Sequence, residues 1–293
     1  MIDLPLVVGS FLVAIIVGLT GMGGGALMTP MMMLFFNVPP LAAVSSDLVA
    51  SAIMKPVGGL VHLRRGTVNL RLVGWLCAGS VPAAFSGVFL VRAFGDGPAV
   101  QQAVKVALGV ALLLAVAGLV LKTWLGDKGG SSSARDVVVR PIPTVLVGIV
   151  GGVVVGVSSV GSGSLIIVAL LALYPALKAN QLVGTDLVQA VPLVGAAALG
   201  HLFFGDFQLD LTLSLLVGSI PGVYLGARIS AWAPSGAIRA LLAVVLLASA
   251  LKLLNVPNTV TLWIVGAAAV LGGAALMVAA RASRRSEDPL RVP

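Results

Sequence analysis

The chain has 293 residues, of which 59% are hydrophobic and only 10% are charged, with a formal net charge of +8. A soluble domain carries roughly 25% charged residues, so this composition and a mean hydropathy of +1.12 exclude an ordinary soluble protein. They indicate a membrane protein with several spans. The pI near 10.4 does not indicate nucleic-acid binding, because the basic residues lie in short loops between apolar segments, where they are typical topology signals.

Apolar segments follow one another along the whole chain and predict an all-α polytopic membrane protein. Two of them, the first and the fifth, are too long for one simple helix across a bilayer, which needs roughly 20 residues. The segments, each uncertain by a few residues at its ends, are 4–36, 42–62, 72–91, 100–121, 142–173, 181–204, 211–227, 237–254 and 259–280.

Each of the two long segments is interrupted by a glycine-rich stretch, residues 18–27 in the first and 156–165 in the second. A glycine inside a helix costs about 1 kcal/mol relative to alanine, so such a cluster marks a place where the helix stops and restarts. Non-helical backbone at membrane depth is tolerated only where it is buried in protein or lines a wet cavity. The sequence therefore predicts two broken-helix sites.

The two halves of the chain repeat each other beyond these breaks. At a spacing of 139 residues, Ser46-Asp47 aligns with Thr185-Asp186, and His62 aligns with His201. A Gly-Ser-rich stretch near the midpoint reads as a flexible linker. The domain prediction is a first repeat with a broken helix and three spans at 1–121, a linker at 122–141, a second repeat at 142–254, and an extra C-terminal helix with a basic tail at 255–293.

The placement of lysine and arginine predicts the topology. If each broken segment is a hairpin that returns to its starting side, then the 62–71 loop, the linker, the 228–239 loop and the basic tail share one side. The positive-inside rule makes that side cytoplasmic. Each half then crosses an odd number of times, so the two repeats are inverted, a plan that recurs in secondary transporters. We expect a bacterial-type inner (plasma) membrane as the location.

Half-helices that start just after Gly25 and Gly163 would present amide groups and positive dipole ends to a shared site. Opposed across a pseudo-two-fold axis, these ends would form a cradle for a small anion. The alternative is that the small residues only permit close helix packing. The candidate substrate contacts are Thr20, Gly21, Gly23, Gly24, Gly25, Ser45, Ser46, Lys55, Ser158, Ser159, Gly161, Ser162, Gly163 and Thr185.

Asp47 and Asp186 lie inside apolar segments, where a carboxylate is costly and usually functional. Each could carry a proton and couple transport to the proton gradient, or cap a broken-helix N-terminus. Lys55 is two helical turns beyond Asp47, and it could face the anion, pair with Asp47, or extend toward the membrane interface. His62 and His201 stand at segment ends, where we expect them to be interfacial.

The glycine-rich break followed by Pro30, and the Ser/Thr-Asp pair, both repeated in a chain of this length, resemble the TauE/SafE family. That family is also called the sulfite exporter or DUF81-type permeases. The resemblance covers almost the whole chain, with 259–280 least clear. It implies an inner-membrane permease, often an exporter of sulfur-containing anions such as sulfite or sulfonates. The second copy departs from the pattern, with Ser162 in place of Gly24 and Val168 in place of Pro30.

Together these features predict a secondary transporter of small anions, an exporter of sulfite or organosulfonate-type compounds, with protons as a candidate coupling ion. The alternatives are an anion channel, an uptake permease, and an intramembrane enzyme that uses Asp47 and Asp186. No HExxH, GxSxG or P-loop pattern occurs in the sequence. We therefore expect no enzyme activity, no cofactor, no metal and no nucleic-acid partner, only the lipid bilayer and the anion.

Overall fold

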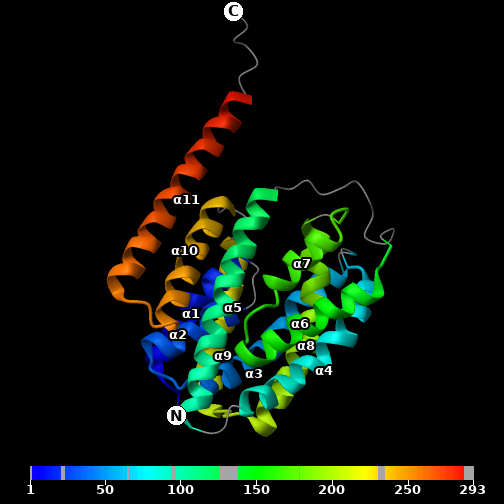
Figure 1. Ribbon diagram of the computed structural model, residues 1–293, viewed down its shortest axis with the longest axis vertical. Coiled ribbons are helices and arrows are strands. Elements are labelled where there is room, and N and C mark those ends of the chain that lie inside the picture. Colours follow the sequence, from blue (N-terminus) through cyan, green and yellow to red (C-terminus); the bar gives the residue numbers. More distant parts are fainter. Residues whose placement is uncertain are drawn as a thin grey trace, which may run out of the picture.

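The computed structural model describes residues 2–20, 24–64, 66, 68–93, 97–125, 138–177, 179–229 and 235–286. Within these residues the chain folds into α-helices packed side by side (Figure 1), which confirms the all-α prediction. The helices are α1 (Leu4–Thr20), α2 (Gly25–Phe35), α3 (Pro40–Arg64), α4 (Leu70–Arg92), α5 (Pro98–Leu125), α6 (Pro141–Ser158), α7 (Leu165–Leu173), α8 (Ala179–Phe204), α9 (Leu209–Ile229), α10 (Ser235–Leu253) and α11 (Asn258–Ser286).

Local sequence signals account for several helix starts. Proline is the first residue of α3, α5 and α6, a position where its missing amide hydrogen costs nothing and its fixed φ suits the helix. Asn69 caps α4, because its side chain accepts a hydrogen bond of 3.0 Å from the backbone amide of Leu72. These residues begin helices close to the segment starts that the apolar pattern predicts.

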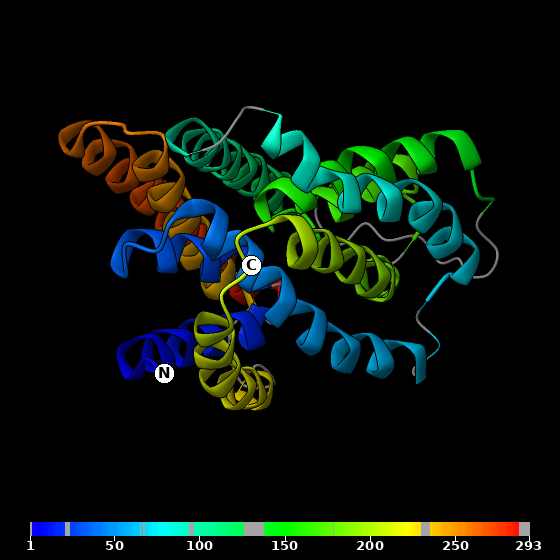
Figure 2. The same cartoon turned by 90° about the horizontal axis from the view of Figure 1, so that it is seen from below.

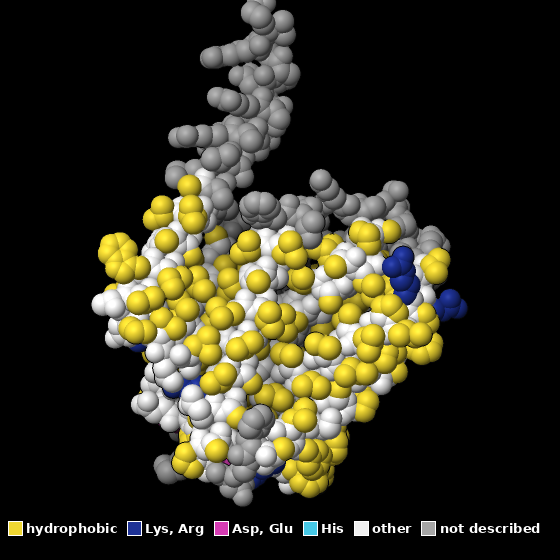
Figure 3. Space-filling view, viewed as in Figure 1, with side chains coloured by type: hydrophobic (Ala, Val, Ile, Leu, Met, Phe, Trp, Pro, Cys, Tyr) yellow, Lys and Arg dark blue, Asp and Glu magenta, His cyan; other side chains and the backbone are white. Residues whose placement is uncertain are grey.

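Five of the described helices are long and apolar enough to cross a membrane. They are Leu70–Arg92, Pro98–Leu121, Pro141–Ser158, Gln181–Phe204 and Leu209–Gly226. The face seen in Figure 3 is covered largely by apolar side chains, and exposed Leu262, Trp263 and Leu271 extend this surface onto α11. A soluble monomer rarely exposes apolar area on this scale, so the surface is suited to lipid.

Both glycine-rich stretches interrupt a helix, and in each case the chain turns back. Gly9, near the start of α1, lies against the ring of Phe36 at the end of α2, since a Cβ added there would be 3.0 Å from the ring. In the second half, the Tyr174 hydroxyl at the end of α7 accepts a 2.8 Å hydrogen bond from the amide of Arg140 at the start of α6. The second helix of each pair therefore runs back along the first.

The first helix of each half packs along the fourth helix of the other half, so that α6 lies along α4 and α1 along α9. Glycines allow both contacts: a Cβ added at Gly87 would be 2.7 Å from the Gly156 backbone. A Cβ added at Gly226, the residue that aligns with Gly87, would be 2.2 Å from the Ile15 carbonyl oxygen. Small residues at such crossings bring backbones into direct van der Waals contact.

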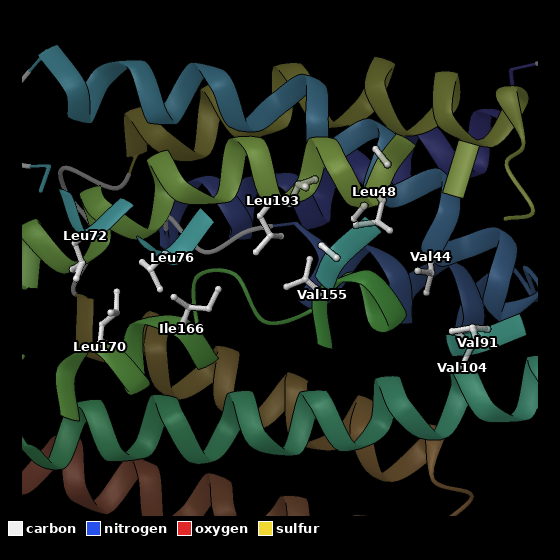
Figure 4. Packing of buried hydrophobic residues seen from close by; sticks show 14 of the residues in the cluster. Val44, Leu48, Leu72, Leu76, Val91, Val104, Val155, Ile166, Leu170 and Leu193 are labelled. Carbon is white, nitrogen blue, oxygen red and sulfur yellow. The ribbon is translucent and has the colours of Figure 1, made fainter. Parts of the chain in front are cut away.

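α3 and α8 lie next to each other in the middle of the bundle (Figure 2). The main buried apolar cluster surrounds them, with Leu48 of α3, Val155 of α6 and Leu193 of α8 close together (Figure 4). α11 packs along α10 and extends beyond the rest of the bundle (Figure 1). The polar residues of α3 and α8 are therefore carried by the two helices at the centre of the protein.

Candidate functional site

The two breaks meet each other, although more than a hundred residues separate them in the sequence. α2 begins at Gly25, and a Cβ added there would be only 2.0 Å from the carbonyl oxygen of Ser159. Ser159 ends α6 in the left-handed conformation, with φ of 59°. Only glycine fits at position 25, because any side chain would overlap the backbone of the other break.

Asp47 of α3 is fully buried at this junction. Its Oδ2 accepts hydrogen bonds from the hydroxyl of Ser159 (2.5 Å) in the second break and from the hydroxyl of Thr29 (3.2 Å) in α2. Its Oδ1 is buried with no hydrogen-bond partner among the described residues. One carboxylate therefore joins α2, α3 and the second break.

Lys55 reaches the same region from the same helix. Its ammonium donates a hydrogen bond to the hydroxyl of Ser162 in the second break, and it lies close enough to Asp186 and Asp47 to interact electrostatically with both. Lys55 is only partly buried, whereas both aspartates are almost wholly inaccessible to solvent. Two carboxylates and one ammonium thus share a small region, where each buried charge needs a partner.

The second break has its own internal bonds. Gly161 and Gly163 have positive φ, 133° and 94°, which glycine adopts readily. The amides of Ser164, Leu165 and Ile166 all donate to the carbonyl of Gly161, and the Ser158 hydroxyl accepts from the Val160 amide at 3.2 Å. The start of α7 therefore presents fewer free amides than the sequence predicts.

The start of α2 is different in this respect. The amides that bond back to the carbonyl of Gly24 are those of Leu27 and Met28, so the bonds begin after the first two residues of the helix. Gly24 and Gly25 carry no side chains to cover this end. Gly21 and Gly23 lie outside the described residues. Thr20 ends α1, and its side chain also lies outside them.

The structure places three predicted contacts, Ser45, Ser46 and Thr185, away from the meeting point of the breaks. The Ser46 hydroxyl accepts from the Gln208 amide at 3.4 Å, in the connection between α8 and α9. The Thr185 hydroxyl accepts from the Asn69 amide at 3.2 Å, in the connection between α3 and α4. Ser46 aligns with Thr185 and Asn69 with Gln208 at the repeat spacing. These hydroxyls join the first turns of α3 to the connection after α8, and the first turns of α8 to the connection after α3.

Ser45 contacts a histidine whose position differs from the prediction. We expected His201 at the membrane interface, but it is fully buried. Its Nε2 is 2.6 Å from the carbonyl oxygen of Gly156, and its Nδ1 is 2.9 Å from the Ser45 hydroxyl. A carbonyl only accepts, so Nε2 carries the hydrogen, and in the neutral ring Nδ1 accepts from Ser45. The repeat spacing from His62 was the one sequence signal that set this histidine apart.

Comparisons with known proteins place this arrangement in a family. The family described as Sulfite exporter TauE/SafE matches residues 6–253, which ends at the last residue of α10. The chain is 36% identical over 251 residues to the probable membrane transporter protein YjnA of Bacillus subtilis (strain 168), covering 83% of this chain and 96% of the relative. It is 27% identical over 219 residues to the probable membrane transporter protein YdhB of the same organism, covering 74% and 86%. No solved structure matches.

These matches confirm the predicted resemblance, and they extend over both glycine breaks and over α3 and α8. The family consists of membrane transporters and not of enzymes, which removes the intramembrane enzyme as an alternative. The family description also implies a small anion as substrate. This chain is an integral membrane protein and belongs to the TauE/SafE family of membrane transporters.

Proposed function

We propose that this protein is a secondary transporter that exports small sulfur-containing anions, sulfite or organosulfonates, through a site where the two glycine breaks meet. The observation that carries the proposal is the contact of Gly25 with Ser159, with Asp47 and Lys55 bound to the same junction. Irregular backbone that is buried inside a membrane protein suits a substrate site. The family description names sulfite, which agrees with a site that contains an ammonium and hydroxyl donors.

The proposed architecture is a pair of inverted repeats, each beginning with a re-entrant hairpin. The packing of α1 on α9 and of α6 on α4 supports it, because the two halves exchange equivalent helices, as inverted repeats would. The bond between Ser46 and Gln208 and the bond between Thr185 and Asn69 likewise join equivalent positions, exchanged between the two halves. We assign the repeats to 1–121 and 142–254, with 122–141 and the tail on the cytoplasmic side of the inner membrane.

In this proposal Lys55 supplies the positive charge that attracts the anion, and the Ser162 hydroxyl that it contacts is a further ligand. The positive end of α2, at Gly24 and Gly25, faces the same junction. Asp47 carries the proton. Its carboxylate is bound by Ser159 and Thr29, so gain or loss of a proton at Asp47 changes the contact between the two halves directly.

The test is anion flux into or out of proteoliposomes, with sulfite, methanesulfonate, sulfate and acetate compared under an imposed pH gradient. We expect sulfite and the sulfonate to move fastest, and the pH gradient to drive them. Asp47→Asn keeps the size and the hydrogen bonding but removes the titrating proton, so concentration driven by the pH gradient is lost. Asp210→Asn, at an exposed position in the first turn of α9, is the matched control and keeps it.

Two results would overturn these assignments. Flux of no tested anion in either direction would reject the anion site. An unchanged response of Asp47→Asn to the pH gradient would reject proton coupling at Asp47. Flux that follows the anion gradient without saturation would identify a channel. Accumulation of the anion in the direction opposite to export would identify an uptake permease. The same assay therefore distinguishes both from an exporter.

A further inference from the structure

Ser51 lies one helical turn from Asp47 and one turn from Lys55, so the three side chains share one face of α3. Ser51 is only 2% exposed, and its hydroxyl has no hydrogen-bond partner among the described residues. The hydroxyl faces the first break, since a Cβ added at Gly24 would be 3.9 Å from Ser51 Oγ. A buried polar group without a partner is rare and costly.

Three other helical serines in the described part of the protein avoid this cost. Ser10, Ser158 and Ser214 each donate to a backbone carbonyl three or four residues earlier in their own helix, at 2.9, 2.6 and 2.8 Å. This bond is available to any helical serine. Ser51 does not form it, and its hydroxyl lies beside Gly24, the residue that precedes α2.

Two neighbours of this hydroxyl favour a negative charge, and the carboxylate of Asp47, one turn earlier on α3, opposes it unless it is protonated. The N-terminal end of α2 carries the positive end of the helix dipole, and the ammonium of Lys55 lies one turn further along α3. The second half offers no equivalent, because the residues that align with Ser51 and Lys55 are Ala190 and Val194. The hydroxyl of Ser51 and the ammonium of Lys55 therefore have no counterpart at the aligned positions of α8.

We propose that the Ser51 hydroxyl donates a hydrogen bond to the transported anion, which lies against α3 between Gly24 and Lys55 and not symmetrically between the two halves. The proposal rests on the anion-transport function proposed above. An oxyanion or sulfonate fits this set of groups, because one oxygen can accept from Ser51 while another contacts Lys55. Ser51 is then a residue that sets affinity for the anion.

The test compares Ser51→Ala with Ser219→Ala. Ser219 of α9 is likewise buried, with a hydroxyl that has no partner among the described residues, so it controls for loss of a buried hydroxyl in general. The measurements are the KM for sulfite in proteoliposomes and the melting temperature in detergent with and without sulfite. A hydrogen bond to a charged group predicts a KM raised at least about 10-fold in Ser51→Ala, with no change in Ser219→Ala.

Stability separates a ligand contact from a structural one. Without anion, Ser51→Ala should melt at the same temperature as the wild type or higher, because it removes an unsatisfied group. With sulfite, its stabilisation by the anion should shrink. A lower melting temperature without anion, an unchanged KM, or an equal rise of KM in Ser219→Ala would each overturn the role of Ser51. If the wild type neither transports nor binds any tested anion, the result rejects the proposed function and not the role of Ser51 alone.

Discussion

Replacing Gly25 with alanine tests whether contact between the two breaks holds the protein together. The added Cβ would lie 2.0 Å from the Ser159 carbonyl oxygen and 2.8 Å from its carbonyl carbon. These atoms belong to backbone, which cannot rotate away as a side chain can, so the two breaks must separate. Overpacking of a tight core costs typically about 1–3 kcal/mol, and we expect a loss of stability at the upper end of this range.

Gly24→Ala is the matched control, one residue earlier. Its Cβ would meet only side-chain atoms, the nearest at 3.6 Å from Met28 Cγ, which is ordinary van der Waals contact. Its backbone is already helical, with φ of −57° and ψ of −33°, so alanine fits there without strain.

The assay is thermal unfolding of the purified variants in one detergent, together with anion flux in proteoliposomes. Gly25→Ala should lower the melting temperature and the flux, whereas Gly24→Ala should change stability by less than about 1 kcal/mol. Equal melting temperatures for the two variants would refute the view that the breaks press against each other at Gly25.

Two other substitutions test the packing around the site. His201→Phe keeps a ring of similar volume but leaves the Gly156 carbonyl and the Ser45 hydroxyl without the hydrogen bonds that His201 forms. Thermal unfolding followed by circular dichroism should show a loss of stability of about 1–3 kcal/mol. An unchanged melting temperature would contradict the buried position of His201. Gly87→Ala and Gly226→Ala place a Cβ within 3.0 Å of the backbone of a crossing helix, but Gly74→Ala meets nothing within 4 Å. Both crowded variants should therefore unfold at lower temperature than Gly74→Ala, and similar losses at both would fit equivalent crossings in the two halves.

The helices and the breaks were predictable from the sequence for a physical reason. In a membrane, apolar runs of sufficient length have few alternatives to helix, so the segment predicted at 72–91 appears as α4 and that at 181–204 as α8. The glycine clusters then identify where helices end, as at Thr20 and Ser158. This local chemistry does not depend on how the helices are arranged around one another.

The hydrogen bonds of the site were not predictable, because they depend on which faces of distant helices meet. Ser45 stands two positions from Asp47, yet it bonds to His201, while Asp47 bonds to Ser159. Residues two positions apart lie on different faces of a helix, so neighbours in a sequence motif need not contact the same partners. Ser51 could not be predicted as a site residue for the same reason, because a serine in an apolar helix indicates no function until its neighbours in space are known.

Charge balance constrains how the proposed anion, Lys55 and the two aspartates could share this region. The described centre of the protein contains Asp47 and Asp186 near a single ammonium, so an arriving anion adds a negative charge where carboxylates already compete for Lys55. Burial of an uncompensated charge is strongly unfavourable. In the proposed mechanism, a proton on Asp47 would neutralise one carboxylate before the anion enters, and it would also weaken the bond of Asp47 to Ser159. In this proposal, anion binding would therefore depend on the charge of Asp47 and on the contact that Asp47 makes between the two breaks.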